Sequence, residues 1–431
     1  MILRLSNSLQ RGILVVAAFA FAISLSYFSI RNARAFHFAS LQTLEGIQHA
    51  TRLEPDDARN WYLLGRYWLY NLEDPDVLRA IRAFLSASAL NPRSAETWLD
   101  LATAYELEGN LTAARDDFLR AKRAYPLSPD VSWRYGNFLL RQRELEPAFA
   151  EMRHAVETDP KRGAEAFSRS LRVEPNIDKI LDGILPPIGD VYMDVIWDQI
   201  TDGQTDIALK VWDRLVAIHP RLPLRDVYPL VGTLRNAKRI TDARRVWDQA
   251  VIVAGLADLQ GPPGSILWDG GFESGVTGVG YSWFFPEGLR NVQFSVDAQE
   301  RHSGSHSLRL TFDGESIVTS VDICHYVPVQ PSTSYRFSAW MKTRAVTTDQ
   351  GVRFKLRSLG AQNASVTVTP EVHGSEPWTH LEIPWSSGKD VQEVEVCLVR
   401  FLSDQIENKI KGTTWVDDVG LVPEAVEHPK P

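Results

Sequence analysis

Three prolines recur at an interval of 34 residues, and the same order of large and small residues precedes each of them. These prolines are Pro92, Pro126 and Pro160. Before the second of them, the repeated positions are Trp98, Leu101, Ala102, Tyr105, Gly109, Ala114, Phe118 and Ala121. An interval of this length indicates paired helices that bury their apolar faces only by stacking on neighbouring units. Proline ends the second helix, because it lacks an N–H and disfavours helix in the residue before it.

The preceding unit repeats the pattern, with about three extra residues around Glu73–Asp76. Its matching positions are Trp61, Leu64, Gly65, Trp68, Ala80, Phe84, Ala87 and Pro92. The pattern resembles the tetratricopeptide repeat family. The resemblance implies an all-α solenoid over residues 37–160, whose concave surface binds protein partners. Weaker matches predict divergent helical repeats over residues 161–260.

The N-terminal segment Gly12–Ile30 is apolar and uncharged, and its length is close to the ~20 residues of a membrane-spanning helix. Two arginines lie on each side of it, so the positive-inside rule gives no clear orientation. A signal peptide is the alternative, because Ala33-Arg34-Ala35 has the A-x-A form of a cleavage site. Length and flanks favour an uncleaved anchor over residues 1–36. With either interpretation, most of the chain is expected in the periplasm or outside the cell.

Composition narrows the classes of function. A chain of 431 residues has room for two or three domains. Its net charge of −8 and the lack of a long basic run argue against a nucleic-acid partner. The sequence has no GxSxG, HExxH, P-loop or dinucleotide-binding motif, and no carboxylate pair is placed for glycoside hydrolysis. The protein is therefore not expected to be an enzyme.

The pattern changes after a Gly/Pro linker at residues 261–265. Large apolar residues then alternate with polar ones, as in Tyr335-Arg336-Phe337-Ser338-Ala339. This period of two, with turn residues between the runs, indicates half-buried antiparallel strands. We predict an all-β sandwich over residues 266–423 and a tail over 424–431.

Four motifs in this region occur in a recognisable order. They are Asp269-Gly270-Gly271-Phe272-Glu273, Ser303-Gly304-Ser305-His306-Ser307-Leu308, Pro331-Ser332-Thr333-Ser334-Tyr335 and Thr414-Trp415-Val416-Asp417-Asp418. In this order they resemble carbohydrate-binding modules of the family 4 and 9 kind, which are galactose-binding-like jelly rolls. The resemblance implies that the opening and closing strands pair. Glu273 and Asp417 would then face one structural calcium ion, with carboxylate oxygens as ligands; Asp417 matches the family position better than Asp418. Solvated carboxylates at a strand end are the alternative.

The same resemblance implies a sugar site built on aromatic side chains. Tyr281, Trp283 and Phe285 lie in a loop between Gly and Pro and form the candidate platform. The alternative is that they anchor the loop to the sandwich. Trp378 and Trp385 are expected in the core.

A second candidate sugar surface lies on strand faces. Arg353, Lys355 and Arg357 share one face of a strand, and Trp340 lies between Arg336 and Lys342 on another. If the two strands were neighbours, a basic stripe with one aromatic residue would suit an acidic polysaccharide. An ordinary solvated strand face is the alternative.

The two cysteines, Cys324 and Cys397, belong to no CxxC motif or Cys/His cluster, which argues against zinc. An oxidising compartment would permit a disulfide between them, provided that their strands are neighbours; a buried free thiol is the alternative.

Together these features predict a membrane-anchored, exported, non-enzymatic scaffold. Its repeats would bind protein partners, and its sandwich would bind a cell-envelope or extracellular polysaccharide, in a bacterial envelope process such as exopolysaccharide assembly or export. The alternative is a purely structural protein–protein assembly factor whose sandwich no longer binds sugar.

Overall fold

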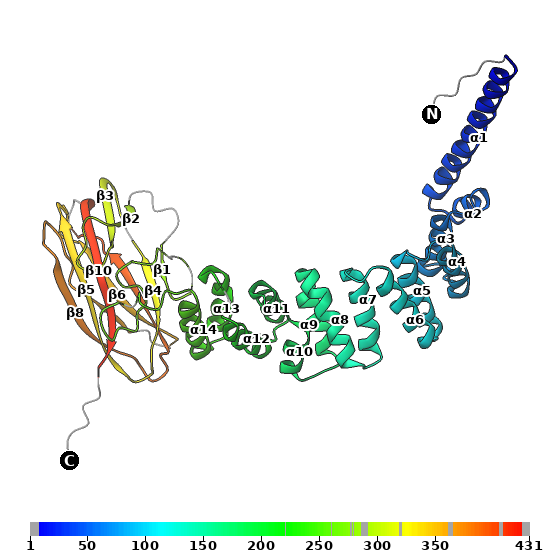
Figure 1. The fold of residues 1–431 in the computed structure, drawn as a ribbon. Coiled ribbons are helices and arrows are strands. Elements are labelled where there is room, and N and C mark those ends of the chain that lie inside the picture. The colour runs from blue at the N-terminus through cyan, green and yellow to red at the C-terminus, as the bar shows by residue number, and fades with distance from the viewer. Residues whose placement is uncertain are drawn as a thin grey trace. The chain divides into compact units, whose positions relative to one another are not determined.

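The computed structural model describes residues 8–219, 221–259, 261–275, 278, 280–285, 292–318, 321–360, 365–404 and 408–424 (Figure 1). Most of the expected tail at 424–431 lies outside the described residues. The chain divides into two compact units, Met1–Pro186 and Pro187–Pro431. The division falls at Pro186-Pro187, inside the region expected to hold divergent repeats.

Unit 1 is entirely helical in its described residues, and its central part consists of three hairpins of antiparallel helices. Its elements are α1 (Ser8–Ser40), α2 (Leu44–Leu53), α3 (Ala58–Tyr70), α4 (Val77–Leu90), α5 (Ala95–Glu108), α6 (Leu111–Ala124), α7 (Pro129–Arg141), α8 (Leu145–Thr158), the 3₁₀ turn η1 (Pro160–Arg162), α9 (Gly163–Leu171) and α10 (Ile177–Ile184). The hairpins α3–α4, α5–α6 and α7–α8 are the three clear sequence repeats, and this confirms the tetratricopeptide-repeat architecture.

The hairpins close because small residues face large ones where two helices cross. A β-carbon added to Gly65 of α3 would lie 2.6 Å from ring atoms of Phe84 on α4, and that ring is fully buried. Side chains at the helix starts satisfy free backbone N–H groups: Ser94 and Ser128 accept from the amides of Thr97 and Val131. The sequence pattern therefore specifies both the crossing and the helix boundaries.

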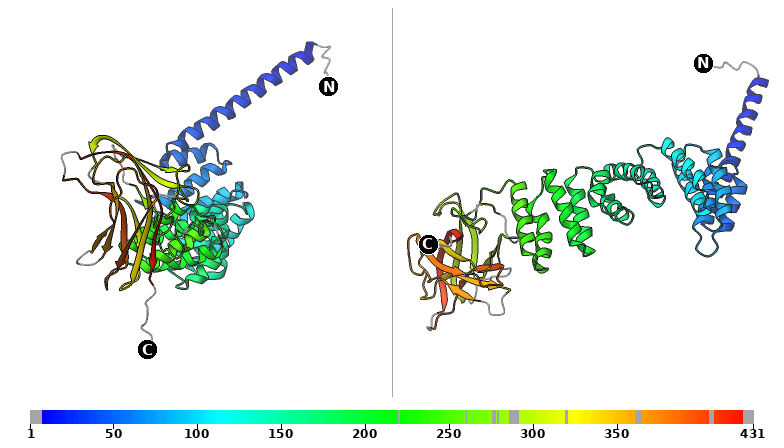
Figure 2. Two further views of the ribbon diagram at one scale, coloured as in Figure 1. Left: turned by 90° about the vertical axis from the view of Figure 1, so that its left-hand side faces the viewer. Right: turned by 90° about the horizontal axis from the view of Figure 1, so that it is seen from below.

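Helix α1 runs without interruption through the apolar segment and into the first helical contact of unit 1 (Figure 2). Arg11–Ser40 is long and apolar enough to cross a membrane, and none of its most apolar window is buried. Towards its end, Ala35 and Ala39 are buried against Ala50 of α2. The expected boundary at residue 36 thus falls inside a continuous helix.

Unit 2 begins with two more helical hairpins and ends in the β-sandwich. Its helices are α11 (Gly189–Thr201), α12 (Thr205–Ala217), α13 (Leu224–Asn236) and α14 (Ile240–Val253). Its strands are β1 (Trp283–Phe284), β2 (Val292–Asp297), β3 (Ser307–Ile317), β4 (Ile323–Pro328), β5 (Ser334–Arg344), β6 (Val352–Leu359), β7 (Val366–Val368), β8 (Thr379–Ser386), β9 (Glu393–Arg400) and β10 (Lys409–Pro423).

The strands form two five-stranded antiparallel sheets, in the orders β1-β4-β9-β6-β7 and β2-β3-β10-β5-β8. Alternate residues point inward and make one core, to which Phe337 of β5 and Phe354 of β6 contribute from opposite sheets with their rings 5.0 Å apart. This arrangement confirms the predicted sandwich. It also shows that β5 and β6 lie in different sheets, so Trp340 and the basic row of β6 cannot form one stripe.

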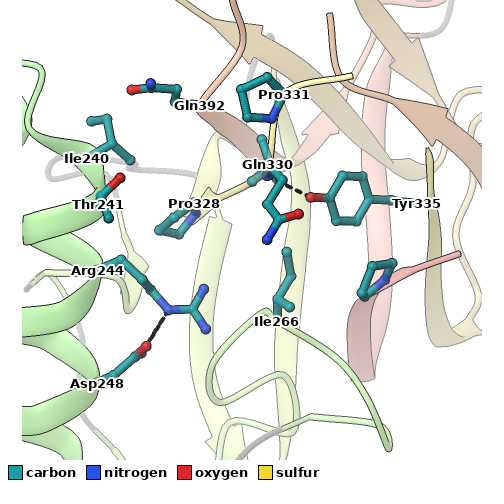
Figure 3. Close-up of a pocket in the computed structure, with 12 residues that line it drawn as sticks. Ile240, Thr241, Arg244, Asp248, Ile266, Pro328, Gln330, Pro331, Tyr335 and Gln392 are labelled. Carbon is teal, nitrogen blue, oxygen red and sulfur yellow. Dashed lines mark hydrogen bonds and ion pairs between the residues drawn. The ribbon is translucent and has the colours of Figure 1, made fainter. Parts of the chain in front are cut away.

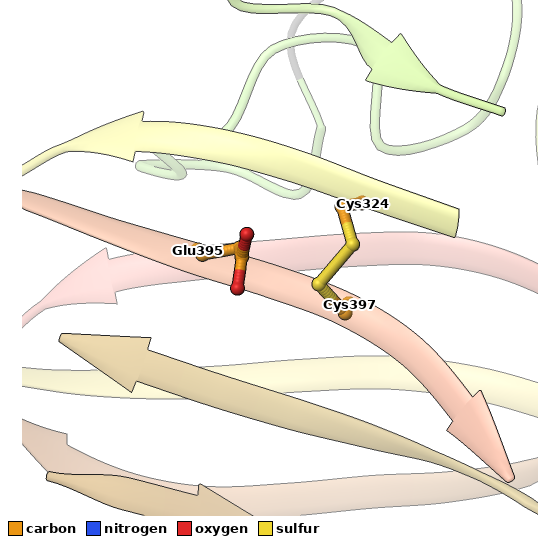
Figure 4. A group of neighbouring side chains, drawn as sticks. All are labelled: Cys324, Glu395 and Cys397. Carbon is orange, nitrogen blue, oxygen red and sulfur yellow. A yellow bond between two sulfur atoms is a disulfide. The ribbon is translucent and has the colours of Figure 1, made fainter. Parts of the chain in front are cut away.

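The two cysteines are joined in a disulfide (Figure 4). Cys324 of β4 and Cys397 of β9 are direct cross-strand partners in the β4–β9 register. The condition set by the sequence, that the two strands be neighbours, is therefore met.

The Gly65–Phe84 crossing gives a test of the repeat packing. Gly65→Ala should lower the free energy of unfolding of unit 1 by about 1–3 kcal/mol, because the added methyl group overlaps the fully buried ring of Phe84 and forces it to shift. Thermal denaturation followed by circular dichroism measures the change. The control is Gly232→Ala in α13, where nothing lies within 4 Å of the added atom; there the better helix propensity of alanine should stabilise by up to about 1 kcal/mol. Equal effects of the two substitutions would contradict the packing.

Candidate functional sites of the sandwich

The predicted aromatic platform is wrong for two of its three residues. Tyr281 and Trp283 are only 2% and 1% exposed. The Trp283 ring stacks on Phe272 and donates its indole N–H to the carbonyl of Asp269, so it belongs to the sandwich core. Tyr281 lies against Trp247 of α14. Phe285 is half-buried and also packs on the core. Neither Tyr281 nor Trp283 presents a free face to a sugar, because anchoring the loop uses their apolar surface.

The basic row of β6 is largely neutralised by neighbouring carboxylates. Arg353 lies 2.9 Å from Glu371, and Arg357 lies 2.7 Å from Glu395. Lys355, between them, is half-buried. The row shares one face of β6 as predicted, but paired charges attract an acidic polysaccharide far less than free ones.

Trp340 lies on the outer face of the other sheet, in an aromatic cluster that the sequence did not reveal. Its ring stacks on His302, with the ring centres 3.9 Å apart and the planes 14° from parallel. His380 of β8 lies 4.9 Å away, and Trp378 makes an edge contact with His302. Trp340 and Trp378 are half-buried, while the two histidines are exposed. We call these four residues the outer aromatic cluster.

Strand pairing and a folded-over loop assemble this cluster. Trp340 and His380 are register partners in the β5–β8 pair. His302 is held above β5 because its Nδ1 lies 2.6 Å from a carboxylate oxygen of Asp418 on β10. The alternation along β5 and β8 predicts which residues face outward, but not that these strands pair. Trp378, expected in the core, lies at this surface; Trp385, 3% exposed, is in the core as expected.

The two predicted calcium ligands both lie near Gly271. A β-carbon added to Gly271 would lie 3.6 Å from Oδ1 of Asp417 and 3.8 Å from Oε1 of Glu273. The opening segment reaches β10 by backbone hydrogen bonds, among them Val419 N–H to the carbonyl of Gly270. The implied pairing of the opening and closing segments is thus present, and it brings the two carboxylates together.

Both carboxylates also hold the loop of residues 302–306. Asp417 accepts from the amides of His302 and Ser303, and Glu273 accepts from the amides of Ser305 and His306. Burial raises the pKa of Asp417 to about 6. Burial acts in the same direction on Glu273, but the amide and imidazole donors outweigh it and lower the pKa of that group. Carboxylate oxygens are the type of ligand that calcium takes, and the calcium site at Glu273 and Asp417 stays a prediction.

A different group is the one set, among the described residues, in which three or more potential metal ligands lie within 4.8 Å of one another: Cys324, Glu395 and Cys397 (Figure 4). The two sulfur atoms are bonded to each other, and Glu395 is paired with Arg357. The group therefore offers no thiolate ligands in this state.

The repeats of unit 1 carry a ladder of charged side chains along α3, α5 and α7. Asp100 and Arg134 occupy equivalent positions of successive repeats, and Arg66 lies in the repeat before them. The carboxylate of Asp100 is 2.8 Å from Arg134 and 3.8 Å from Arg66, and it accepts from the hydroxyl of Tyr70. Arg66 is 53% exposed and lines a cavity of about 570 Å³ with Leu63 and Tyr70. This cavity lies between α3 and the end of α1.

The helical part and the sandwich of this chain are similar to different known proteins. Residues 264–399 match the model of a protein family described as a carbohydrate binding domain, of the family 4 and 9 type. No curated protein matches the chain. Solved structures similar to the sandwich include a family 16 carbohydrate binding module, which is 16% identical and has a TM-score of 0.26, with 36% of this chain and 99% of that chain covered. Another is the CBM22-1 xylan-binding domain of Paenibacillus barcinonensis Xyn10C, which is 16% identical with a TM-score of 0.24, covering 33% of this chain and 85% of that one. A third similar structure is YrrB, a tetratricopeptide-repeat protein with an unusual peptide-binding site; it is 18% identical with a TM-score of 0.29, and the match covers 46% of this chain and all of that one (100%).

Calcium should change how the stability of the sandwich depends on pH. Without the ion, the raised pKa of Asp417 means that its stabilising contribution is complete below the unfolded value of about 3.9 and is lost as the pH rises to about 6. With millimolar calcium the charged carboxylate is compensated, so the melting temperature at pH 7 should rise. Calorimetric scans with calcium or with a chelator measure both effects.

Asp417→Asn should abolish the calcium-dependent rise, and Glu273→Gln should reduce it. Asp418→Asn is the control, because that half-buried neighbour binds the side chains of His302 and Ser303. A wild-type melting temperature that is unchanged by calcium would refute the ion site.

Proposed function

We propose that this protein is a membrane-anchored, exported scaffold that holds a protein partner on its repeats and a polysaccharide of the cell envelope on its sandwich. The observation that carries the proposal is the combination in one chain of helical repeats with a domain that matches a carbohydrate-binding family over residues 264–399. A role in exopolysaccharide assembly or export is the process that this combination fits best. Both parts are of kinds that bind, and the proposal includes no catalytic step.

The outer aromatic cluster is the surface that we propose for the glycan. Sugar rings stack their C–H faces on aromatic side chains, and polar groups around the rings select the hydroxyl pattern. Trp378 and His380 have exposed surface for such stacking, and the pairs Arg336–Glu382 and Lys342–Glu300 lie on the same face of the sheet. The paired charges favour a neutral or weakly acidic glycan over a strongly acidic one.

The continuity of α1 supports an uncleaved anchor. Cleavage within Ala33-Arg34-Ala35 would cut a helix whose next turns are buried against α2. It would also remove Arg31, whose guanidinium makes two hydrogen bonds, of 2.8 and 2.7 Å, to the Glu54 carboxylate. Residues on both sides of the motif thus contribute to one packed helical junction.

The disulfide supports export of the sandwich. Disulfides form and persist in oxidising compartments and are rare in the cytoplasm. The Cys324–Cys397 bond lies in the sandwich, so the C-terminal part of the chain would lie on the oxidising side of the membrane.

The ladder of Arg66, Asp100 and Arg134 supports partner binding by the repeats. Its central carboxylate is already satisfied by Arg134, whereas Arg66 remains half-exposed between Tyr62 and Tyr70. A guanidinium between aromatic rings presents a charged and an apolar contact together, which suits a polypeptide partner with an acidic group.

The anchor is tested by the N-terminus of the protein isolated from membranes. Mass spectrometry should recover peptides that precede Ala35, and the protein should stay in the membrane fraction after a high-salt wash. Phe21→Arg, which places a charge in the apolar segment at a cost of about 2.5–3.5 kcal/mol, should weaken that retention. A mature chain beginning at Ala35 or Phe36 would contradict the anchor.

The glycan surface is tested by retention of the full-length protein on gels that contain polysaccharides. Trp378→Ala should weaken the affinity of the protein for the polysaccharide that retains it about tenfold, which corresponds to ~1.4 kcal/mol. The substitution removes a stacking surface that the core does not need. Phe401→Ala is the matched control, since that ring is 40% exposed but lies over Arg353, away from the cluster. If neither neutral nor acidic polysaccharides retain the wild-type protein, the purely structural alternative is favoured.

A further inference from the structure

The last helix of unit 2 and the sandwich enclose a cavity of about 500 Å³ (Figure 3). Helix α14 forms one wall, and the other wall comes from the ends of β4, β5 and β10 and the segment before β9. This volume is within the range of small-molecule sites, roughly 300–1,000 Å³. The outer aromatic cluster contributes no residue to it, so it is a separate site.

Hydrogen-bond donors and hydrogen-bond acceptors both face this cavity. Arg244 of α14 gives its Nε–H to both carboxylate oxygens of Asp248, at 2.8 and 2.7 Å, and its terminal nitrogens point into the cavity (Figure 3). The side chains of Gln330 and Gln392 lie on the sandwich side and are exposed. Ile266, with neighbouring prolines, supplies apolar surface. Donors, acceptors and a small apolar wall therefore converge.

A second, smaller cavity of about 30 Å³ adjoins the first and shares Arg244, Asp248 and Ile266 with it. Trp247 and Trp268 line it and are 2% and 7% exposed. Within the described part of the chain, neither indole N–H has a hydrogen-bond acceptor. An indole N–H can only donate, and a buried donor without an acceptor is costly. The space is large enough for one oxygen atom the size of a water molecule.

The donors and acceptors that line the two cavities favour a hydroxylated ligand over a carboxylate. A carboxylate ligand needs donors only and would be repelled by Asp248. Hydroxyl groups both donate and accept, so the several hydroxyls of one sugar can between them donate to the Asp248 carboxylate and accept from the Gln amides and the N–H groups of Arg244. An oxygen of the same ligand can enter the small cavity and accept from an indole. The arrangement thus favours a neutral, polyhydroxylated ligand.

We propose that this cavity binds a neutral mono- or disaccharide unit, so that helix and sandwich together hold one end of a glycan. The proposal rests on the proposed function in that the sandwich is taken to contact sugar. It adds a site to which a repeat helix contributes ligand-binding residues.

The test uses the full-length protein in detergent and isothermal calorimetry with three neutral disaccharides: cellobiose, maltose and lactose. It is done in the Trp378→Ala background, where the outer aromatic cluster is disabled. At least one neutral disaccharide should bind, and adding Gln330→Ala with Gln392→Ala should weaken that binding tenfold or more. Gln293→Ala, the same substitution at an exposed position of β2, is the control and should leave the affinity unchanged.

Several results would overturn the inference. One is disaccharide affinity that the paired Gln substitutions leave unchanged. Another is binding of digalacturonate in preference to the neutral sugars, or of a proline-rich peptide alone. Failure of all three disaccharides to bind would also overturn it, even if polysaccharide gels still retain the wild-type protein; that retention would leave the proposed function standing. Gel retention that Trp378→Ala leaves unchanged, together with disaccharide binding that the paired Gln substitutions weaken, would support the cavity and contradict the outer aromatic cluster.

Discussion

The contact of Trp247 with Gly280 decides how the C-terminal half of this protein is built. A β-carbon at Gly280 would lie 2.1 Å from the Trp247 ring, and the glycine has a positive φ of 53° that other residues rarely adopt. The indole of α14 therefore packs directly against the backbone of the sandwich, between Trp268 and Tyr281. The last repeat helix and the sandwich share this apolar junction, and the cavity beside it follows from their approach.

Charge reinforces the same junction. Arg235 of α13 lies 2.8 Å from Glu393 of β9 and 4.0 Å over the ring of Tyr326. Burial by itself would lower the pKa of this guanidinium, but the hydrogen bond to Glu393, the charge of that carboxylate and the neighbouring tyrosines together outweigh burial and raise the pKa. A half-buried ion pair adds little net stability, but loss of one partner is costly, so it favours one particular docking of helix on sheet. The helical repeats of unit 2 consequently cover part of the β1-β4-β9-β6-β7 sheet.

The two proposed sugar-binding surfaces use different physical means. The outer aromatic cluster offers ring faces on an open sheet, which suits internal units of a long chain. The cavity at α14 offers converging polar groups, which suits a chain end or a short unit. The Arg66–Asp100–Arg134 ladder belongs to the other unit of the chain. A scaffold of this kind has its glycan contacts and its partner contacts on separate elements.

The sequence by itself determined the architecture, because the 34-residue repeat and the two-residue alternation of the strands both depend on residues that are near one another in the chain. The 34-residue interval specified crossings such as Gly65 on Phe84, and the alternation in β5 specified which side chains enter the core. The motif order also implied that the opening and closing segments pair, and Val419 of β10 does donate its amide to the carbonyl of Gly270. The surfaces depended on contacts between residues far apart in the chain. Tyr281 and Trp283 read as exposed loop aromatics until α14 and the core were seen to cover them. Trp340 gained His302 through a folded-over loop and His380 through strand pairing, and Arg353 and Arg357 gained carboxylate partners. A local pattern shows which face of a strand a side chain occupies, but only the tertiary structure decides what covers that face.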